Sequence, residues 1–185
     1  MDNSQKAIMI GDGFFITIII ISSVLIISNM GTNLITSAQS QLSGITKGLQ
    51  NQITAAYDGK TLTGAEVIAA FQQYESSEMS VIVLVNSSTK GYTGKYLLTD
   101  GDLKTDKGGS TAPGYTQSYP GGVYYNGTYT EFTSSGTGSR TTLTKLQATG
   151  TGNMGVNASK TFYSSVIKDS TTDTVVGILF VQRAA

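Results

Sequence analysis

The sequence predicts an α+β protein, in which a long hydrophobic and amphipathic N-terminal helix precedes a β-rich domain with one short helix. Three observations support this prediction. An uncharged apolar run extends from Phe14 to Ile27, a helical apolar period continues to Tyr57, and the remaining chain alternates β-branched or aromatic segments with Gly-, Ser- and Thr-rich turns. We therefore expect a helix in residues 1–57 and a head in residues 58–185, which is the size of one domain.

The apolar run has the length of a membrane span. It reads FFITIIIISSVLII and reaches about 21 residues if Ala7 to Gly13 is included, where a bilayer core requires roughly 20. A helix satisfies every backbone polar group of a single span in lipid. With Lys6 on the short N-terminal side, a retained span predicts an N-in, C-out orientation. The alternative is a cleaved secretory signal, although no loop separates the run from the helical pattern that follows it.

Asp12 precedes the most apolar part of this run and has two interpretations. In the first, Asp12 and Gly13 sit at the membrane interface, and the span begins at Phe14 and ends near Met30. In the second, the carboxylate meets a cation when helices bundle, either Lys6 or an N-terminal amine of a neighbouring copy. An acidic side chain within a span raises the free energy of membrane insertion by roughly 2.5 to 3.5 kcal/mol. Each interpretation therefore places the Asp12 carboxylate either at the membrane interface or beside a cation.

Beyond Ile27 the apolar residues recur every three or four positions, which places them on one face of a helix. They are Met30, Leu34, Ala38, Leu42, Ile45, Leu49, Ile53 and Ala56. The opposite face consists of Thr, Ser, Gln and Asn with Lys47 as its single charge, and Asp58-Gly59 is the stop signal. The whole helix measures on the order of 80 Å, so one small head covers only part of its apolar face.

The first part of the head predicts a short helix and a hairpin. Thr63 and Glu66 have the spacing of a capping box, and a helix follows from Ala65 to about Glu75. Its expected core residues are Val67, Ile68, Ala70, Phe71 and Tyr74. The run from Met79 to Asn86 predicts a buried strand, and Tyr92 to Leu98 is its expected hairpin partner.

The rest of the head predicts further strands joined by polar loops. A long loop runs from Asp100 to about Gly122, and Asn126-Gly127 predicts a type I′ hairpin between Val123 and Phe132. A strand is expected at Thr141 to Thr149, followed by a loop from Gly150 to Ala158. The last hairpin pairs Lys160 to Ile167 with Thr174 to Gln182 through a turn at Asp169 to Asp173, and its second strand is expected at the centre of the sheet.

Composition excludes several functions. The formal net charge is zero, so no basic field attracts nucleic acid. The sequence has no Cys and no His, which removes disulfides, thiolate and imidazole metal sites, and the commonest general base. The acidic series Asp100, Asp102 and Asp106 places Lys where an EF-hand calcium loop has oxygen ligands, so a solvated turn is the expected structure. We expect no enzyme activity, no metal and no cofactor.

Two groups of surface candidates lie in the head. Tyrosines gather around one loop and hairpin, and Tyr124, Tyr125 and Tyr129 form either a binding patch for a partner or glycan, or ordinary cross-strand packing. Asn86, Asn126 and Asn157 fit the N-x-[ST] glycosylation pattern and fall in expected turns.

The chain has a short leader, then Gly13 followed by FFITIIIISSVLIIS, then an uninterrupted amphipathic helix and a β-rich head. This arrangement resembles the type IV pilin superfamily, which includes pseudopilins, Tad-type pilins and archaeal-type pilins. The resemblance covers Gly13 to about Tyr57. It implies processing around Gly11 or Gly13, with Phe14 as the mature N-terminus in the second case, and an uncleaved subunit is the other form. Ile18 stands where the family usually has Glu at the fifth mature position.

The resemblance implies a structural subunit of an extracellular pilus-like filament, held in the membrane before assembly and assembled as a helical homo-oligomer by a pilus assembly machinery. The residues expected in the filament core are Asp12, Phe14, Phe15, Ile18, Ile21, Leu25, Met30, Leu34, Leu42 and Leu49. Independently of the family, an apolar stripe that one head cannot cover is covered naturally by neighbouring helices. The alternative is a monomeric, single-pass, membrane-tethered protein of the cell surface that binds or adheres through its head.

Overall fold

The computed structural model describes residues 3–85, 89–107, 119–132, 140–150 and 153–183. The chain forms two compact units, a helical unit, Met1–Leu49, and a head unit, Gln50–Ala185. The protein is α+β, with a long apolar N-terminal helix and a β-rich head, as the sequence predicts. The head unit also contains the last turns of the helix, because Ile53 and Tyr57 pack against its core.

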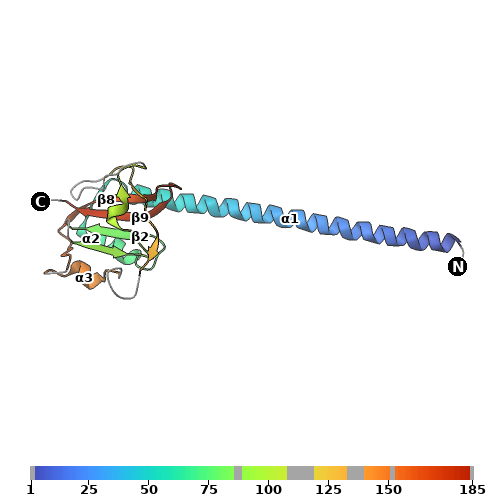
Figure 1. The fold of residues 1–185 in the computed structure, drawn as a ribbon, viewed down its shortest axis with the longest axis horizontal. Helices are drawn as coiled ribbons and strands as arrows, with labels where there is room; N and C mark the ends of the chain where they lie inside the picture. Colours follow the sequence, from blue (N-terminus) through green and yellow to red (C-terminus); the bar gives the residue numbers. More distant parts are fainter. Residues whose placement is uncertain (1–2, 86–88, 108–118, 133–139, 151–152, 184–185) are drawn as a thin grey trace. The chain divides into compact units, whose positions relative to one another are not determined.

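Helix α1 spans Asn3–Tyr57 and is drawn in Figure 1 as one continuous coil from blue to cyan. Its predicted end is confirmed: Asp58 and Gly59 form a turn, and Gly59 has a φ of 63°, which favours glycine. The Asp58 carboxylate accepts a hydrogen bond from the Gly121 N–H at 2.7 Å. The residue that ends α1 is therefore also tied to a distant loop of the head.

The head contains one large and one small sheet. The elements after α1 are β1 Lys60–Thr63, α2 Gly64–Gln73, β2 Ser80–Leu84, β3 Lys90–Thr93, β4 Tyr96–Leu97, the 3-10 turn Asp100–Asp102, β5 Leu103–Lys104, β6 Val123–Tyr125, β7 Thr130–Glu131, α3 Leu143–Gln147, β8 Thr161–Asp169 and β9 Val175–Gln182. The large sheet has the strand order β3-β2-β9-β8-β6-β5, with β1 also pairing with β8, and the small sheet joins β4 to β7.

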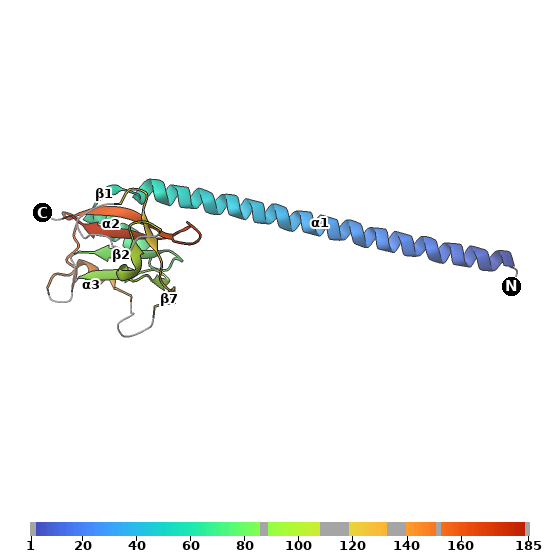
Figure 2. The ribbon, with the colours of Figure 1, turned by 45° about the horizontal axis from the view of Figure 1, so that its top comes forward.

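The C-terminal hairpin organises the large sheet. Strands β8 and β9 pair antiparallel, as predicted, and β9 lies at the centre with β2 parallel on its other side. The outer edge of β8 pairs first with β1, antiparallel, and further along with β6, parallel. Figure 2 shows β1 near this orange and red hairpin. The most hydrophobic strand of the head, β9, thus lies between two neighbouring strands, and its residues from Gly177 to Val181 are buried.

Both faces of the large sheet are covered. Val81 and Val83 of β2 face one core cluster, and Ile82 and Leu84 face the other. The first cluster includes Val67 and Phe71 of α2 and Leu146 of α3, and the second includes Leu98, Leu103, Val123 and Tyr125. The predicted strand over Met79 to Asn86 reads as a continuous apolar run because it is buried on both sides.

The predicted helix after the capping box is confirmed as α2. Thr63 accepts from the Glu66 N–H, and the Glu66 carboxylate accepts from the Thr63 N–H, so both halves of the capping box are present. Val67, Ala70 and Phe71 are buried, whereas Ile68 and Tyr74 are partly buried against the same cluster. The apolar period of the sequence thus identified the core side of the helix.

The predicted hairpin partner of β2 is wrong in its extent. β3 ends at Thr93, and the chain leaves the sheet at Gly94, which has a φ of 99°. A Cβ at Gly94 would lie 2.2 Å from the carbonyl oxygen of Met79, so only glycine fits this close approach. Tyr96 and Leu97 form a separate strand, β4, which pairs with β7.

The predicted type I′ hairpin at Asn126-Gly127 is wrong. β6 pairs with β5 and β8, and β7 pairs with β4, so the two flanking segments do not pair with each other. Neither Asn126 nor Gly127 has the positive φ that a type I′ turn requires. Gly127 instead packs closely against the Tyr125 hydroxyl and the Asp102 carboxylate. The pairing of β6 and β7 with other strands therefore overrides the local preference of Asn126-Gly127 for a hairpin turn.

The predicted strand from Thr141 to Thr149 is wrong as well, because this segment contains helix α3. Thr142 caps it by accepting from the Lys145 N–H, and Leu146 is buried while Leu143 is partly buried. A spacing of three between the leucines is a helical spacing, and the imperfect alternation of the segment reflects this. Part of the long predicted loop is also a strand, β5, whereas residues 108–118 lie outside the described residues.

Candidate functional site

The helical unit exposes a large apolar surface. The residues expected in a filament core are helical, and from Phe14 onward their exposed fractions lie between 54% and 73%. They are Phe14, Phe15, Ile18, Ile21, Leu25, Met30, Leu34, Leu42 and Leu49. The backbone of Asp12 is helical, and its side chain lies outside what the structure describes. A contiguous apolar surface of this size indicates an interaction site for lipid or protein.

Five hydroxyl groups of α1 are satisfied within the helix. Each bonds to the carbonyl oxygen four residues earlier, at 2.8 to 2.9 Å. The donors are Thr17, Ser23, Thr32, Thr36 and Thr46. A hydroxyl that returns to its own helix needs no water, so these positions enter an apolar environment without an unpaired donor.

Within the described residues, α1 is the one helix that is long and apolar enough to cross a membrane, from Gly13 to Tyr57, and none of its most apolar window is buried. Lys47 is the single charged residue in that range, and its side chain is exposed. The sequence and the structure thus agree on a helix compatible with membrane anchoring.

The residues predicted for processing lie inside this helix. Gly11, Gly13 and Phe14 all have helical backbone. A Cβ added to Gly13 would meet nothing within 4 Å, so no packing in the isolated chain requires this glycine.

The predicted tyrosine patch divides into different environments. Tyr125 is 2% exposed, and its hydroxyl donates to the Thr128 carbonyl at 3.0 Å. The prediction that Tyr125 lies on the surface is therefore wrong, because the residue belongs to the core. Tyr129 is 38% exposed, and its ring lies 5.3 Å from that of Tyr125 and 5.8 Å from that of Tyr96. Tyr124 is half-buried under the Lys107 ammonium. Tyr125 therefore packs in the core, whereas Tyr124 and Tyr129 remain partly exposed.

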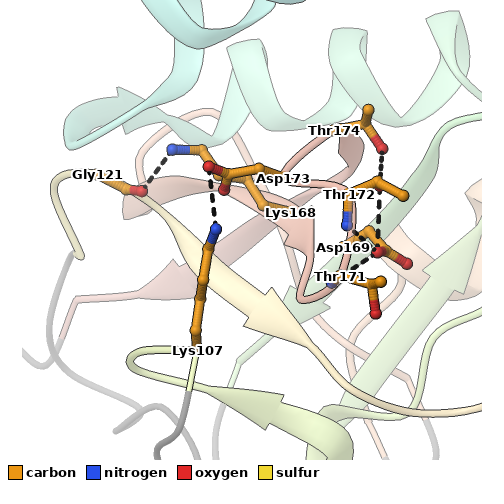
Figure 3. A network of polar contacts seen from close by, with 8 residues as sticks. All are labelled: Lys107, Gly121, Lys168, Asp169, Thr171, Thr172, Asp173 and Thr174. Carbon is orange, nitrogen blue, oxygen red and sulfur yellow. Dashed lines mark hydrogen bonds and ion pairs between the residues drawn. The ribbon is translucent and has the colours of Figure 1, made fainter.

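A polar network closes the turn between β8 and β9 (Figure 3). The Asp169 carboxylate accepts from the N–H groups of Thr171 and Thr172 at 2.9 and 2.8 Å, and from the Tyr129 hydroxyl. The hydrogen bond from Tyr129 and those from the turn lower the pKa of Asp169, whereas burial and the ionised Asp169 raise the pKa of Tyr129. These contacts build the turn.

One lysine contacts this turn, and a second connects β8 to the loop before β6. Lys107 forms an ion pair with Asp173 at 3.2 Å, and Lys168 donates to the Gly121 carbonyl at 2.9 Å (Figure 3). Asp173 has a φ of 61°, a conformation that Asp adopts in turns. In the described parts of the chain, no group of three or more Asp or Glu residues is placed to hold a metal ion. Asp102, from the calcium-like series, accepts from the Thr99 hydroxyl.

Two of the three predicted glycosylation positions are described, and both are exposed. Asn126 Oδ1 accepts from Ser170 at 3.3 Å, and Asn157 Oδ1 accepts from the Ser159 N–H at 3.1 Å. Asn86 lies outside the described residues.

Sequence reasoning missed a groove in the head unit. It lies between the last turn of α1, β1 and α2, with a volume of about 280 Å³. Its lining residues are Ala56, Tyr57, Leu62, Glu66, Ala69, Ala70 and Gln73. Alanine pairs at the end of α1 and in α2 were the available signal, because small side chains on two neighbouring helices leave space between them.

No protein-family model matches this chain, and no curated protein or solved structure matches it either.

Proposed function

We propose that the protein is a structural subunit of a helical filament on the cell surface, anchored in the membrane by α1 before assembly. The observation that carries the proposal is the exposed, almost uncharged surface of α1. Its exposed large apolar side chains present an area on the order of 1,500 Å², whereas the largest patch of a typical monomer is about 300 to 600 Å². In the functional protein this apolar surface of α1 is therefore buried against lipid or against other protein.

Lipid covers one part of α1 and leaves another. A bilayer core accommodates roughly 20 residues of helix. A span that begins near Phe14 therefore ends before Leu34, and Leu34, Leu42 and Leu49 remain to be covered outside the lipid. Their exposed fractions of 54% to 73% are similar to the 50% to 70% of the large apolar residues from Phe14 to Met30. The α1 helices of other copies can bury these residues, because they carry the same apolar face over the same length.

Assembly transfers α1 from lipid to a bundle of identical helices. Because lipid is as apolar as leucine, the transfer is driven by close packing and by the loss of lipid contacts. The hydroxyls bonded within the helix, such as those of Thr17 and Ser23, need no new partner in either environment. Contacts between identical subunits that do not close into a ring extend into an open filament. The partners are other copies of the chain, the membrane and the machinery that extracts subunits from it.

The proposal is tested on material sheared from producing cells, by negative-stain electron microscopy and N-terminal sequencing of the same fraction. Fibres that begin at Phe14 or Asp12 identify a processed subunit, and fibres that begin at Met1 an uncleaved one. Leu42→Lys should abolish fibres and leave the protein in the membrane fraction. Thr144→Lys, at an exposed position of α3, is the matched control and should assemble normally. Wild-type protein that yields no fibres and extracts as a monomer in detergent would support the tethered binding protein instead.

A further inference from the structure

The groove between α2 and the end of α1 is apolar at its floor and acidic at one side. Tyr57, Leu62 and Ala70 provide apolar surface, while exposed Ala56 and Ala69 leave the groove open to solvent. Alanines at the rim admit a helix closely, because they hold no long side chain over the opening. The shape fits a helical segment with small side chains at the point of contact.

Glu66 gives the groove its charge. Its Oε2 atom accepts from the Thr63 N–H at 2.7 Å and from the Thr63 hydroxyl at 2.9 Å. These hydrogen bonds lower the pKa of Glu66, so the carboxylate is ionised at neutral pH. Among the described residues, no cation forms an ion pair with Glu66. The groove therefore presents a fixed negative charge beside apolar surface.

Lys47 is the complementary charge on α1. It is exposed and forms no ion pair with any described residue. By helical periodicity it lies on the face opposite the stripe of Leu34, Leu42 and Leu49. Ser43 and Gly44, one turn before it, are small and leave the ammonium accessible. The two faces of α1 therefore require different partners: an apolar surface for the leucine face, and a surface with a carboxylate for the Lys47 face.

If assembly removes the Lys47 ammonium from water, the unpaired charge destabilises the contact between subunits. An ammonium group that is taken out of water without a partner destabilises an interface by several kcal/mol, whereas a hydrogen-bonded ion pair offsets much of that penalty. We propose that the groove receives the Lys47 segment of α1 from a second copy of the chain, with Lys47 paired to Glu66. This inference rests on the proposed filament and assigns one of its contacts between subunits.

Cross-linking tests the contact directly. A water-soluble carbodiimide condenses a carboxylate and an adjacent amine into an amide, and the reagent takes up the lost water as a urea. Treated wild-type fibres should yield a covalent dimer, and mass spectrometry of its fragments should find an amide between Glu66 and Lys47. Detergent-extracted monomers should not form this dimer. Fibres without the Glu66–Lys47 amide would overturn the inference and leave the proposed function standing.

Variants provide a second readout. Ala69→Arg fills the groove at an exposed position, and Gln72→Arg places the same side chain on α2 outside the groove. Ala69→Arg and Lys47→Glu should each reduce the yield of fibres at least about tenfold relative to Gln72→Arg, whereas Lys47→Arg, which keeps the positive charge, should retain the wild-type yield. Equal yields from Ala69→Arg and Gln72→Arg would contradict the inference. A wild-type protein that forms no fibres at all would overturn both the inference and the proposed function.

Discussion

Gly64, the first residue of α2, is packed so tightly that even one added methyl group should destabilise the head. An ideal Cβ at this position would lie 1.8 Å from the carbonyl oxygen of Asn157 and 2.8 Å from its carbonyl carbon. Both are backbone atoms, so no side-chain rotation relieves the clash. The Gly64 N–H also donates to the Lys160 carbonyl at 2.7 Å, which holds the two segments together. Gly64→Ala must therefore separate α2 from the turn before β8.

The size of the effect follows from three contributions. Overpacking of a rigid site costs about 1 to 3 kcal/mol. A weakened hydrogen bond between Gly64 and Lys160 adds about 1 kcal/mol. The lower conformational entropy of alanine in the unfolded chain offsets about 0.4 to 1 kcal/mol. We expect a net loss of about 2 to 3 kcal/mol in the free energy of unfolding.

The measurement is urea unfolding of the Gln50–Ala185 fragment, followed by far-ultraviolet circular dichroism. With a denaturant slope of about 2 kcal/mol per molar, the midpoint should fall by about 1 M. Gly101→Ala is the matched control, because a Cβ there meets nothing within 4 Å and the residue has no positive φ. If both variants unfold at the same urea concentration, the close approach of Asn157 to Gly64 does not exist in solution.

Three further predictions concern buried and titrating groups of the head. Thr93→Val should raise the free energy of unfolding by about 1 kcal/mol, because the buried Thr93 hydroxyl has no hydrogen-bond partner among the described residues; an unchanged urea midpoint would contradict this. The folded-state pKa values of Glu66 and Asp169 are lowered, so their contribution to stability is present above the ordinary carboxyl range and is lost as the pH falls through the folded-state pKa. Glu66→Gln should flatten this acid limb of the pH profile, and a profile of unchanged slope would exclude Glu66 as a cause. Tyr129→Phe removes a donor to Asp169 and should raise the pKa of Asp169 toward its ordinary value in a carboxyl NMR titration, whereas an unshifted titration would show that the bond is not formed.

Local signals predicted the elements whose structure depends on neighbouring residues. The period of α1, the capping box of Thr63 and Glu66, and the hairpin of β8 and β9 depend on residues at most about 20 positions apart, and all three are confirmed. The predicted Asn126-Gly127 turn failed because β6 pairs with strands far away in the sequence. The predicted strand at Thr141 to Thr149 failed because its segment is short and one capping hydrogen bond from Thr142 stabilises a helix.

The sequence by itself determined the apolar helix, its single charge at Lys47 and the absence of Cys and His, because these are properties of composition and spacing. Only the tertiary structure decided that Tyr125 belongs to the core, that β2 and β9 run parallel side by side, and that Ala69 and Glu66 border a groove. Those outcomes depend on segments separated by about ten to about a hundred residues. Their pairing is selected by the burial of both sheet faces together, a global quantity that no window of sequence contains.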